Sequence, residues 1–119
     1  MTMKIIVAGS RTFADYQLLE ETLDDIIKEK HIVNPIIVSG TCYGADKLGE
    51  QYAQKRGYQV IQFKPKWETH GKSASFIRNK EMADNADLLV AFWDGQSKGT
   101  AMMIDIMKKQ HKHGFVITL

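Results

Sequence analysis

Short apolar runs alternate along the chain with longer stretches in which apolar residues recur every three or four positions. The runs lie at residues 4–8, 36–38, 59–63, 88–93 and 115–119, are rich in β-branched side chains and contain few polar ones. Runs of this kind are typical of strands that are covered on both faces in a parallel sheet. The pattern therefore predicts five buried strands.

The stretches between the runs have the periodicity of amphipathic helices. In the first, Leu19, Leu23, Ile26 and Ile27 fall at i, i+4, i+7 and i+8, and Asp15 is a candidate N-cap. The pattern predicts three further helices from the stripes Ala45, Leu48 and Tyr52; Phe76, Ile77, Ala83 and Ala86; and Met103, Ile104, Met107 and His111.

This alternation of strands and helices predicts an α/β fold. Helices that connect parallel strands form right-handed crossovers and cover both faces of the sheet. We expect one Rossmann-like domain over residues 1–119, a three-layer α/β/α sandwich with a five-stranded, mainly parallel sheet. In such sheets ligands bind beyond the carboxyl ends of the strands, where the strand order reverses.

Composition and charge argue against two classes of partner, duplex nucleic acid and membranes. The chain has 119 residues, 44% of them apolar, and its 16 basic and 14 acidic residues give a net charge of +2 with no long block of one sign. Duplex nucleic acid is therefore an unlikely partner. No apolar run reaches the length of a membrane span, and the first run is expected to be a strand rather than a signal peptide. A single cysteine, Cys42, fits a reducing, cytoplasmic location.

Three of the predicted strands end in loops that pair glycine with hydroxyl side chains. They are Gly9-Ser10-Arg11, the segment 39–46 and the segment 94–100, and the last two run directly into a predicted helix. Glycine lets the backbone approach an anion closely, and the N–H groups at a helix start favour negative charge. Each loop alone could equally be an ordinary turn with a cap. The sequence contains neither Gly-x-Gly-x-x-Gly nor the nucleoside triphosphatase loop.

The combination of motifs resembles the SLOG superfamily, in the single-domain YspA and cpYpsA-related branch. The matching residues extend over essentially the whole chain: Gly9-Ser10-Arg11, Ser39-Gly40-x-x-x-Gly44-Ala45-Asp46, Trp67 with Gly71-Lys72, Arg78-Asn79-x-x-Met82-Ala83, and Gly99-Thr100. The superfamily includes the Lonely Guy phosphoribohydrolases, the Smf/DprA proteins of DNA processing, and sensors of NAD-derived signals. The resemblance implies a bacterial or phage protein that holds a nucleotide or nucleotide-derived molecule at the edge of a Rossmann-like sheet.

The sequence departs from the enzymes of this superfamily at the fourth strand. Lonely Guy enzymes have a catalytic glutamate shortly after their Gly-Thr pair, whereas Ala101, Met102 and Met103 follow Thr100 here. Cleavage of a glycosidic bond needs a carboxylate near the ribosyl carbon. Asp94, Asp46 or Asp105 could substitute for the glutamate. Asp94 is the best placed and is the candidate catalytic residue, although Asp-Gly is also a common turn pair.

The candidate ligand-binding residues follow from the loops and from the resemblance. Arg11 and Arg78 would bind phosphate, Asp46 would accept from ribose hydroxyls or simply favour its helix start, and Trp67 would cover the site. We predict neither a metal nor a cofactor, because His111 and His113 lack a third ligand. The predicted ligand-binding residues are Gly9, Ser10, Arg11, Ser39, Gly40, Thr41, Gly44, Asp46, Trp67, Lys72, Arg78, Asn79, Gly99 and Thr100.

Three functional hypotheses remain open from the sequence. The first is a binding module, a sensor or signal-sequestering protein whose partner is a nucleotide-derived small molecule of the NAD or ADP-ribose kind. The second is a nucleotide N-glycosidase or phosphoribohydrolase of the Lonely Guy type with a relocated carboxylate. The third is a non-catalytic oligomerising protein. We expect a homo-oligomer in the first two cases as well, and no membrane partner.

Overall fold

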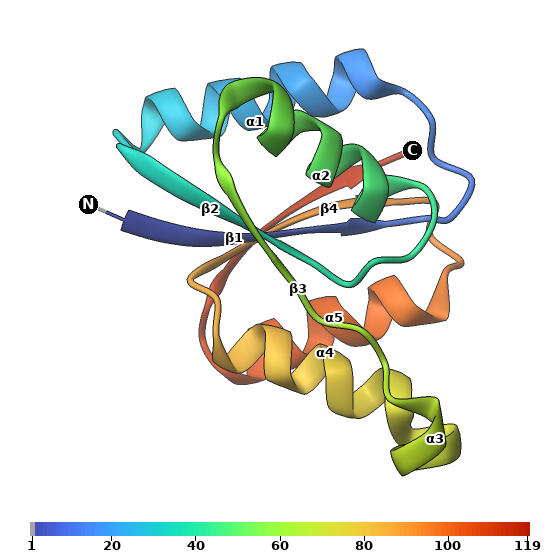
Figure 1. Ribbon diagram of the computed structural model, residues 1–119. Helices are drawn as coiled ribbons and strands as arrows, with labels where there is room; N and C mark the ends of the chain where they lie inside the picture. The colour runs from blue at the N-terminus through green and yellow to red at the C-terminus, as the bar shows by residue number, and fades with distance from the viewer. Residues whose placement is uncertain (1) are drawn as a thin grey trace.

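Five parallel strands form one sheet between two layers of helices in the computed structural model, which describes residues 2–119 (Figure 1). The predicted Rossmann-like α/β fold is confirmed. The elements are β1 (Thr2–Gly9), α1 (Tyr16–Glu29), β2 (Asn34–Ser39), α2 (Ala45–Arg56), β3 (Gln59–Gln62), α3 (Trp67–His70), the 3₁₀ turn η1 (Gly71–Ser73), α4 (Ala74–Asp84), β4 (Leu88–Trp93), α5 (Lys98–Lys109) and β5 (His113–Thr118).

The strand order reverses around the first strand. The sheet has the order β3-β2-β1-β4-β5, and Ile5 of β1 pairs with Ile37 of β2 on one side and Leu88 of β4 on the other. Strands β2 and β3 are thus added on one side of β1, and β4 and β5 are added on the other side. The loops that follow β1 and β4 therefore separate at the carboxyl edge of the sheet, which lies on the right in Figure 1.

The helices cover the two faces in sequence order. Helices α1 and α2 lie on one face of the sheet, and α4 and α5 lie on the other (Figure 1). The core under α1 and α2 is built from large side chains such as Leu23, Tyr52 and Phe92, whereas the core over α4 and α5 is built mainly from alanine and methionine, for example Met103. Phe92 of β4 is fully buried, and Met103 and Met107 of α5 are buried as well.

Three details differ from the sequence prediction. Residues 67–73, a polar stretch in which no helix was predicted, form the short helix α3 and the 3₁₀ turn η1. Phe76 was predicted to lie on the apolar face of its helix but is 51% exposed, because Ala74 and Met82 supply the buried face of α4 instead. His111 lies beyond the end of α5 in a turn with φ 57°.

Among the helices of residues 2–119, α1 alone is capped by a side chain at its N-terminus. Asp15 accepts from the backbone N–H of Leu18 at 3.1 Å, as predicted. Within residues 2–119, the N-cap residue of α2 is Gly44, which has no side chain, and the side chains of Ser73 and Ser97, the N-cap residues of α4 and α5, form no such bond. The first N–H groups of these three helices are therefore left without a side-chain acceptor at the carboxyl edge of the sheet.

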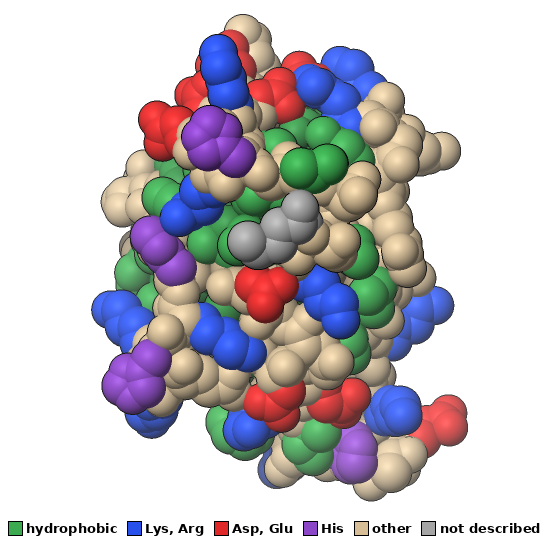
Figure 2. Space-filling view, turned by 90° about the vertical axis from the view of Figure 1, so that its left-hand side faces the viewer, with side chains coloured by type: hydrophobic (Ala, Val, Ile, Leu, Met, Phe, Trp, Pro, Cys, Tyr) green, Lys and Arg blue, Asp and Glu red, His purple; other side chains and the backbone are tan. Residues whose placement is uncertain are grey.

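The opposite edge of the molecule carries charges of both signs. Figure 2 shows the end at which the strands begin, where Lys and Arg side chains are interspersed with Asp and Glu around a group of hydrophobic side chains. None of the helices within the described part of the chain is long and apolar enough to cross a membrane.

Candidate functional site

A pocket opens at the carboxyl edge of the sheet, on the face covered by α4 and α5. It lies where the strand order reverses, between the loops after β1, β2 and β4 and the first turns of α4 and α5. The position agrees with the general location of ligands in open α/β sheets. Its lining consists of Ala8, Gly9, Arg11, Gly40, Cys42, Asp46, Ser75, Arg78, Asn79, Met82, Ser97, Gly99, Thr100 and Met103.

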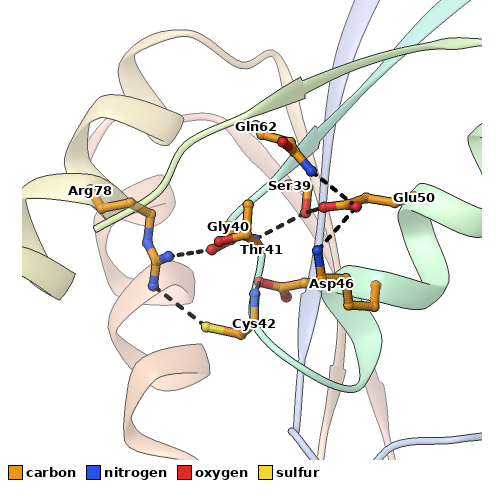
Figure 3. Close-up of polar contacts among 9 residues, drawn as sticks. Ser39, Gly40, Thr41, Cys42, Asp46, Glu50, Gln62 and Arg78 are labelled. Carbon is orange, nitrogen blue, oxygen red and sulfur yellow. Dashed lines mark hydrogen bonds and ion pairs between the residues drawn. The ribbon is translucent and has the colours of Figure 1, made fainter. Parts of the chain in front are cut away.

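The guanidinium of Arg78 is the central positive charge of the pocket. Arg78 is only 8% exposed, and it donates to the carbonyl oxygen of Gly40 and, at 2.8 Å, to Oδ1 of Asn79. Its Nη2 lies 3.9 Å from the Cys42 Sγ (Figure 3). Among the ion pairs of residues 2–119 none includes Arg78. A buried cation that has no carboxylate partner favours an anionic ligand.

A buried carboxylate, that of Asp46, faces the same pocket from the first turn of α2. Asp46 is 6% exposed, and its Oδ2 accepts from the backbone N–H of Cys42 at 3.1 Å (Figure 3). Burial raises the pKa of Asp46 to about 6, against the opposing effects of the Cys42 N–H and the Arg78 charge. The carboxyl is thus close to half protonated at a slightly acidic pH.

Two glycines bring these groups and their loops into close contact. A Cβ atom on Gly44 would lie 2.2 Å from the carbonyl oxygen of Ser10, and Gly44 has φ 79°, so only glycine fits between the β1 and β2 loops. Gly40 separates the two charged groups of the pocket: a Cβ there would lie 2.9 Å from Oδ2 of Asp46 and 3.1 Å from Nη1 of Arg78.

A chain of hydrogen bonds holds the β2–α2 loop in an unusual conformation. Thr41 has φ 68°, a region that β-branched residues rarely adopt. Its backbone N–H donates to Ser39 Oγ at 3.1 Å, and Ser39 Oγ donates to Glu50 at 2.6 Å. Gln62 of β3 also donates to Glu50, at 3.1 Å (Figure 3), and Lys47 donates to Glu50 at 3.4 Å. The strain of this loop is therefore supported from α2 and β3.

The pocket brings together eight of the predicted ligand-binding residues: Gly9, Arg11, Gly40, Asp46, Arg78, Asn79, Gly99 and Thr100. The other predicted residues have different surroundings. Ser10 accepts from the Asp94 N–H at 3.2 Å, whereas Ser39 and Thr41 belong to the hydrogen-bond chain described above. Gly44 packs against the β1 loop, and Trp67 and Lys72 are exposed on α3 and η1 without lining the pocket. The binding roles of all fourteen residues stay predictions.

The candidate catalytic residue, Asp94, is engaged in its own loop. Its Oδ1 accepts from the backbone N–H groups of Ser97 and Gln96, both at 2.8 Å, and it does not line the pocket. These bonds, that of Ser97 first, lower the pKa of Asp94. The geometry is that of an Asp-Gly turn, the alternative considered from the sequence, and a catalytic role for Asp94 stays a prediction.

Four polar residues near the site were missed from the sequence as ligand-binding candidates. Ser75, Ser97 and Cys42 line the pocket, and Glu50 anchors the strained loop. Ser75 and Ser97 lie at helix starts, where a serine is usually read as a cap. Glu50 follows Asp46 by one helical turn, and that i, i+4 spacing on α2 was the signal that could have indicated it. Within the described residues, no group of three His, Cys, Asp or Glu side chains is arranged to hold a metal ion.

Solved structures similar to this chain come from proteins of DNA processing. DNA processing protein A of Streptococcus pneumoniae aligns with 97% of this chain and 50% of its own length at 18% identity, with a TM-score of 0.76. A structure of the Helicobacter pylori protein, described for its single-stranded DNA binding mode, aligns with 96% of this chain and 64% of its own length at 18% identity and a TM-score of 0.71. The chain thus spans half to two-thirds of these proteins, and the likeness shows a shared fold.

These neighbours correct the predicted partner. A nucleotide-derived small molecule as the sole partner was wrong as a prediction for this fold, because the Helicobacter pylori neighbour is described as binding single-stranded DNA. Proteins that bind single strands combine a positively charged groove with aromatic side chains that stack on the bases, so a net charge of +2 without a long basic block excludes single strands less strongly than duplexes. That duplex nucleic acid is not a partner stays a prediction.

Sequence relatives identify the family. The Gene 61 protein of Mycobacterium phage D29 is 31% identical over 103 residues, which cover 82% of each chain, and it fits the predicted bacterial or phage origin. The family described as YspA, cpYpsA-related SLOG matches residues 3–70, more than half of the sequence. The chain belongs to the YspA, cpYpsA-related SLOG family.

Proposed function

We propose that the pocket binds the phosphate group of a nucleotide unit and holds that unit intact. The observation that carries this proposal is the buried guanidinium of Arg78, which lies in the pocket and forms no ion pair within residues 2–119. A guanidinium offers parallel N–H donors that match the oxygens of a phosphate. Arg11, also in the lining and exposed, would add a second positive charge at the entrance.

The helix starts around the pocket support the same ligand. Helices α2, α4 and α5 each contribute residues of their first turn to the lining: Asp46, Ser75, and Gly99 with Thr100. The first N–H groups of α2 and α4, those of Ala45 and Ala74, already donate to the backbone carbonyls of Ser10 and Gly71. At the start of α5, where no side-chain cap is present, a phosphate would be an acceptor for the first N–H groups, and the dipoles of all three helices would favour its charge.

The nucleotide unit could be free or part of a single strand, and its phosphate chemistry would be the same. Three exposed aromatic residues lie at this edge of the sheet: Tyr43 in the β2–α2 loop, Trp67 in α3 and Phe76 in the first turn of α4. Lys66 and Lys72 flank Trp67 in sequence and are exposed. Aromatic faces beside cations suit stacked, unpaired bases, which gives the single-stranded source specific support.

Binding of the nucleotide unit without cleavage agrees with the hydrogen bonds that the carboxylates near the site already accept. Asp94 is bound to the N–H groups of its own loop, and Asp46 is tied by one oxygen to Cys42. A sensor or sequestering role follows from binding without cleavage. Recovery of the ligand by mass detection after incubation tests this point, since release of free base would contradict it.

Isothermal titration with AMP and fluorescence anisotropy with a labelled oligothymidylate test the proposal. Arg11→Ala should weaken binding of either ligand about tenfold to a hundredfold, because hydrogen bonds to charged groups contribute about 1.5–3 kcal/mol. Arg78→Lys, which keeps the charge but loses the fork, should also weaken it, with circular dichroism to confirm folding. Lys28→Ala, an exposed charge at the far end of α1, is the matched control. Binding of neither ligand, or binding unaffected by both arginine variants, would overturn the proposal.

A further inference from the structure

The carboxylate of Asp46 has one oxygen without a hydrogen-bond partner. Oδ2 accepts from Cys42, whereas the hydrogen bonds of residues 2–119 include none to Oδ1. Asp46 is more than nine-tenths buried and lines the pocket. Among residues 2–119 the hydroxyl of Tyr16 is the fully buried side-chain polar atom without a partner, so Oδ1 of Asp46 is open to solvent at the pocket. An ionised carboxylate only accepts hydrogen bonds, so a ligand that reaches this oxygen can replace water there with a donor of its own.

Opposite charges stand on the two sides of Gly40 without forming an ion pair. A Cβ on Gly40 would meet both Oδ2 of Asp46 and Nη1 of Arg78, but no nitrogen of Arg78 lies within 4.0 Å of an Asp46 oxygen among the described ion pairs. A second phosphate would be repelled by Asp46. The pocket thus suits a ligand that carries a negative group next to hydroxyl donors.

We propose that the pocket selects ribonucleotides over deoxyribonucleotides, with Asp46 accepting a hydrogen bond from a ribose hydroxyl while Arg78 binds the neighbouring phosphate. The inference rests on the proposed function and specifies its ligand. A phosphate oxygen cannot supply the missing donor, and deoxyribose has one hydroxyl fewer than ribose. The 2′-hydroxyl is the group by which proteins distinguish RNA from DNA at a given position. A ligand that displaces the water on this oxygen but lacks the hydroxyl leaves the acceptor without a donor, so the site favours the ligand that carries the hydroxyl.

The protonation of Asp46 gives the inference a pH signature. Its charge is influenced by Arg78 from α4, by the Cys42 N–H from the β2 loop, and by Glu50 and Lys47 from its own helix. Burial raises the pKa of Asp46 to about 6. Above that pH the ionised carboxylate accepts the ribose hydroxyl strongly, and below it the neutral acid accepts more weakly. The preference for ribose should therefore fall as the pH drops through about 6.

The test compares AMP with dAMP, which share base and phosphate and differ in the 2′-hydroxyl. Isothermal titration at pH 7.5 should give wild-type protein about tenfold to a hundredfold tighter binding of AMP, the factor expected for one hydrogen bond to a charged group. AMP and dAMP carry the same phosphate, so its titration changes both dissociation constants by the same factor and leaves their ratio unchanged. A change in this ratio when the titration is repeated at pH 5.5 therefore reports the protonation of Asp46. Oligoadenylates of ribose and deoxyribose distinguish a strand from a free nucleotide as the source.

Asp46→Asn is the critical variant. It keeps the shape of the side chain and should bring the AMP to dAMP ratio close to one at both pH values. Asp105→Asn, an exposed residue of α5 that pairs with Lys109, is the matched control and should keep the wild-type ratio. Equal binding of AMP and dAMP by wild type, or an unchanged ratio in Asp46→Asn, would overturn the inference alone. Failure of wild type to bind either nucleotide or either strand would overturn the proposed function with it.

Discussion

The two faces of the same sheet are built for different purposes. Beneath α1 and α2 the core consists of large apolar side chains, with Phe13 stacked on Phe92 at 4.8 Å, and the outside is bound by a charged network of Glu20, Asp24 and Arg56. Over α4 and α5 the core is smaller, and buried polar residues open onto a pocket. One face thus consists mainly of packed apolar side chains, whereas the other carries buried polar groups that line a pocket and are costly to bury.

The largest effect is expected in the apolar core between the sheet and helices α1 and α2. Leu23→Ala removes a fully buried side chain of α1 and should lower the free energy of unfolding by about 2–5 kcal/mol, through lost burial and the cavity that remains. Urea denaturation measures the loss. Binding of AMP by the folded fraction should not change, because Leu23 is not part of the pocket lining. A parallel loss of affinity would mean that the two faces are not separate in function.

The second largest effect is a gain in the free energy of unfolding, expected from a substitution of Asp46 in the pocket. Asp46 has a native pKa of about 6, above its unfolded value, so the native state holds the proton more tightly and loses stability as the pH rises from about 4 to 6. Roughly two pKa units correspond to a cost on the order of 3 kcal/mol at pH 7. Asp46→Asn should remove this cost and be more stable than wild type at pH 7.5, with little difference near pH 4. Denaturation at both pH values checks the sign; a less stable variant at pH 7.5 would contradict it.

A smaller gain is expected at the strained loop. Thr41→Gly relieves the positive φ, which costs a branched residue about 1–2 kcal/mol, but adds the flexibility of glycine, so the net gain should be about 0.5–1 kcal/mol. Thermal denaturation at neutral pH measures it. Thr69→Gly, in the short and exposed helix α3, is a control in which the same substitution should destabilise. Equal effects at both positions would argue against stored strain.

The smallest effect on stability is expected from the surface ion pairs between α1 and α2. Arg56 binds Asp24 at 2.7 Å and Glu20 at 3.1 Å on the surface of α1 and α2. Arg56→Ala should lower the melting temperature slightly at low salt, and the difference should shrink in 1 M NaCl because exposed charges are screened. A large, salt-independent loss would instead point to packing of the guanidinium over Tyr52, whose ring lies 5.2 Å away.

The fold could be predicted from the sequence because its signals are local. Apolar runs such as 88–93 are unbroken, and the periodicity of α1 and the cap at Asp15 agree with one another. The helix α4 was less predictable: its buried face includes Arg78 and Asn79, so apolar periodicity misplaced Phe76. That departure arises because the helix serves the pocket as well as the core.

The site could be predicted only in part, since it depends on distances that the sequence does not contain. The loops after β1, β2 and β4 were found from their glycines, and the structure brings them together. That Asp94 turns back on its own loop, and that Glu50 reaches Ser39 from α2, depends on side-chain directions set by the tertiary fold. The nature of the ligand is a further step, which neither local pattern nor fold determines.

The hydrogen-bond chain through Ser39 and Glu50 also affects the thermodynamics of binding. A loop that must be ordered by its ligand subtracts that lost freedom from the affinity. Here α2 and β3 already hold the β2–α2 loop in place without a ligand. The loss of conformational entropy of this loop therefore occurs on folding and not on binding. The protein should consequently meet its ligand as a preorganised receptor, with association limited by encounter rather than by closure of the loop.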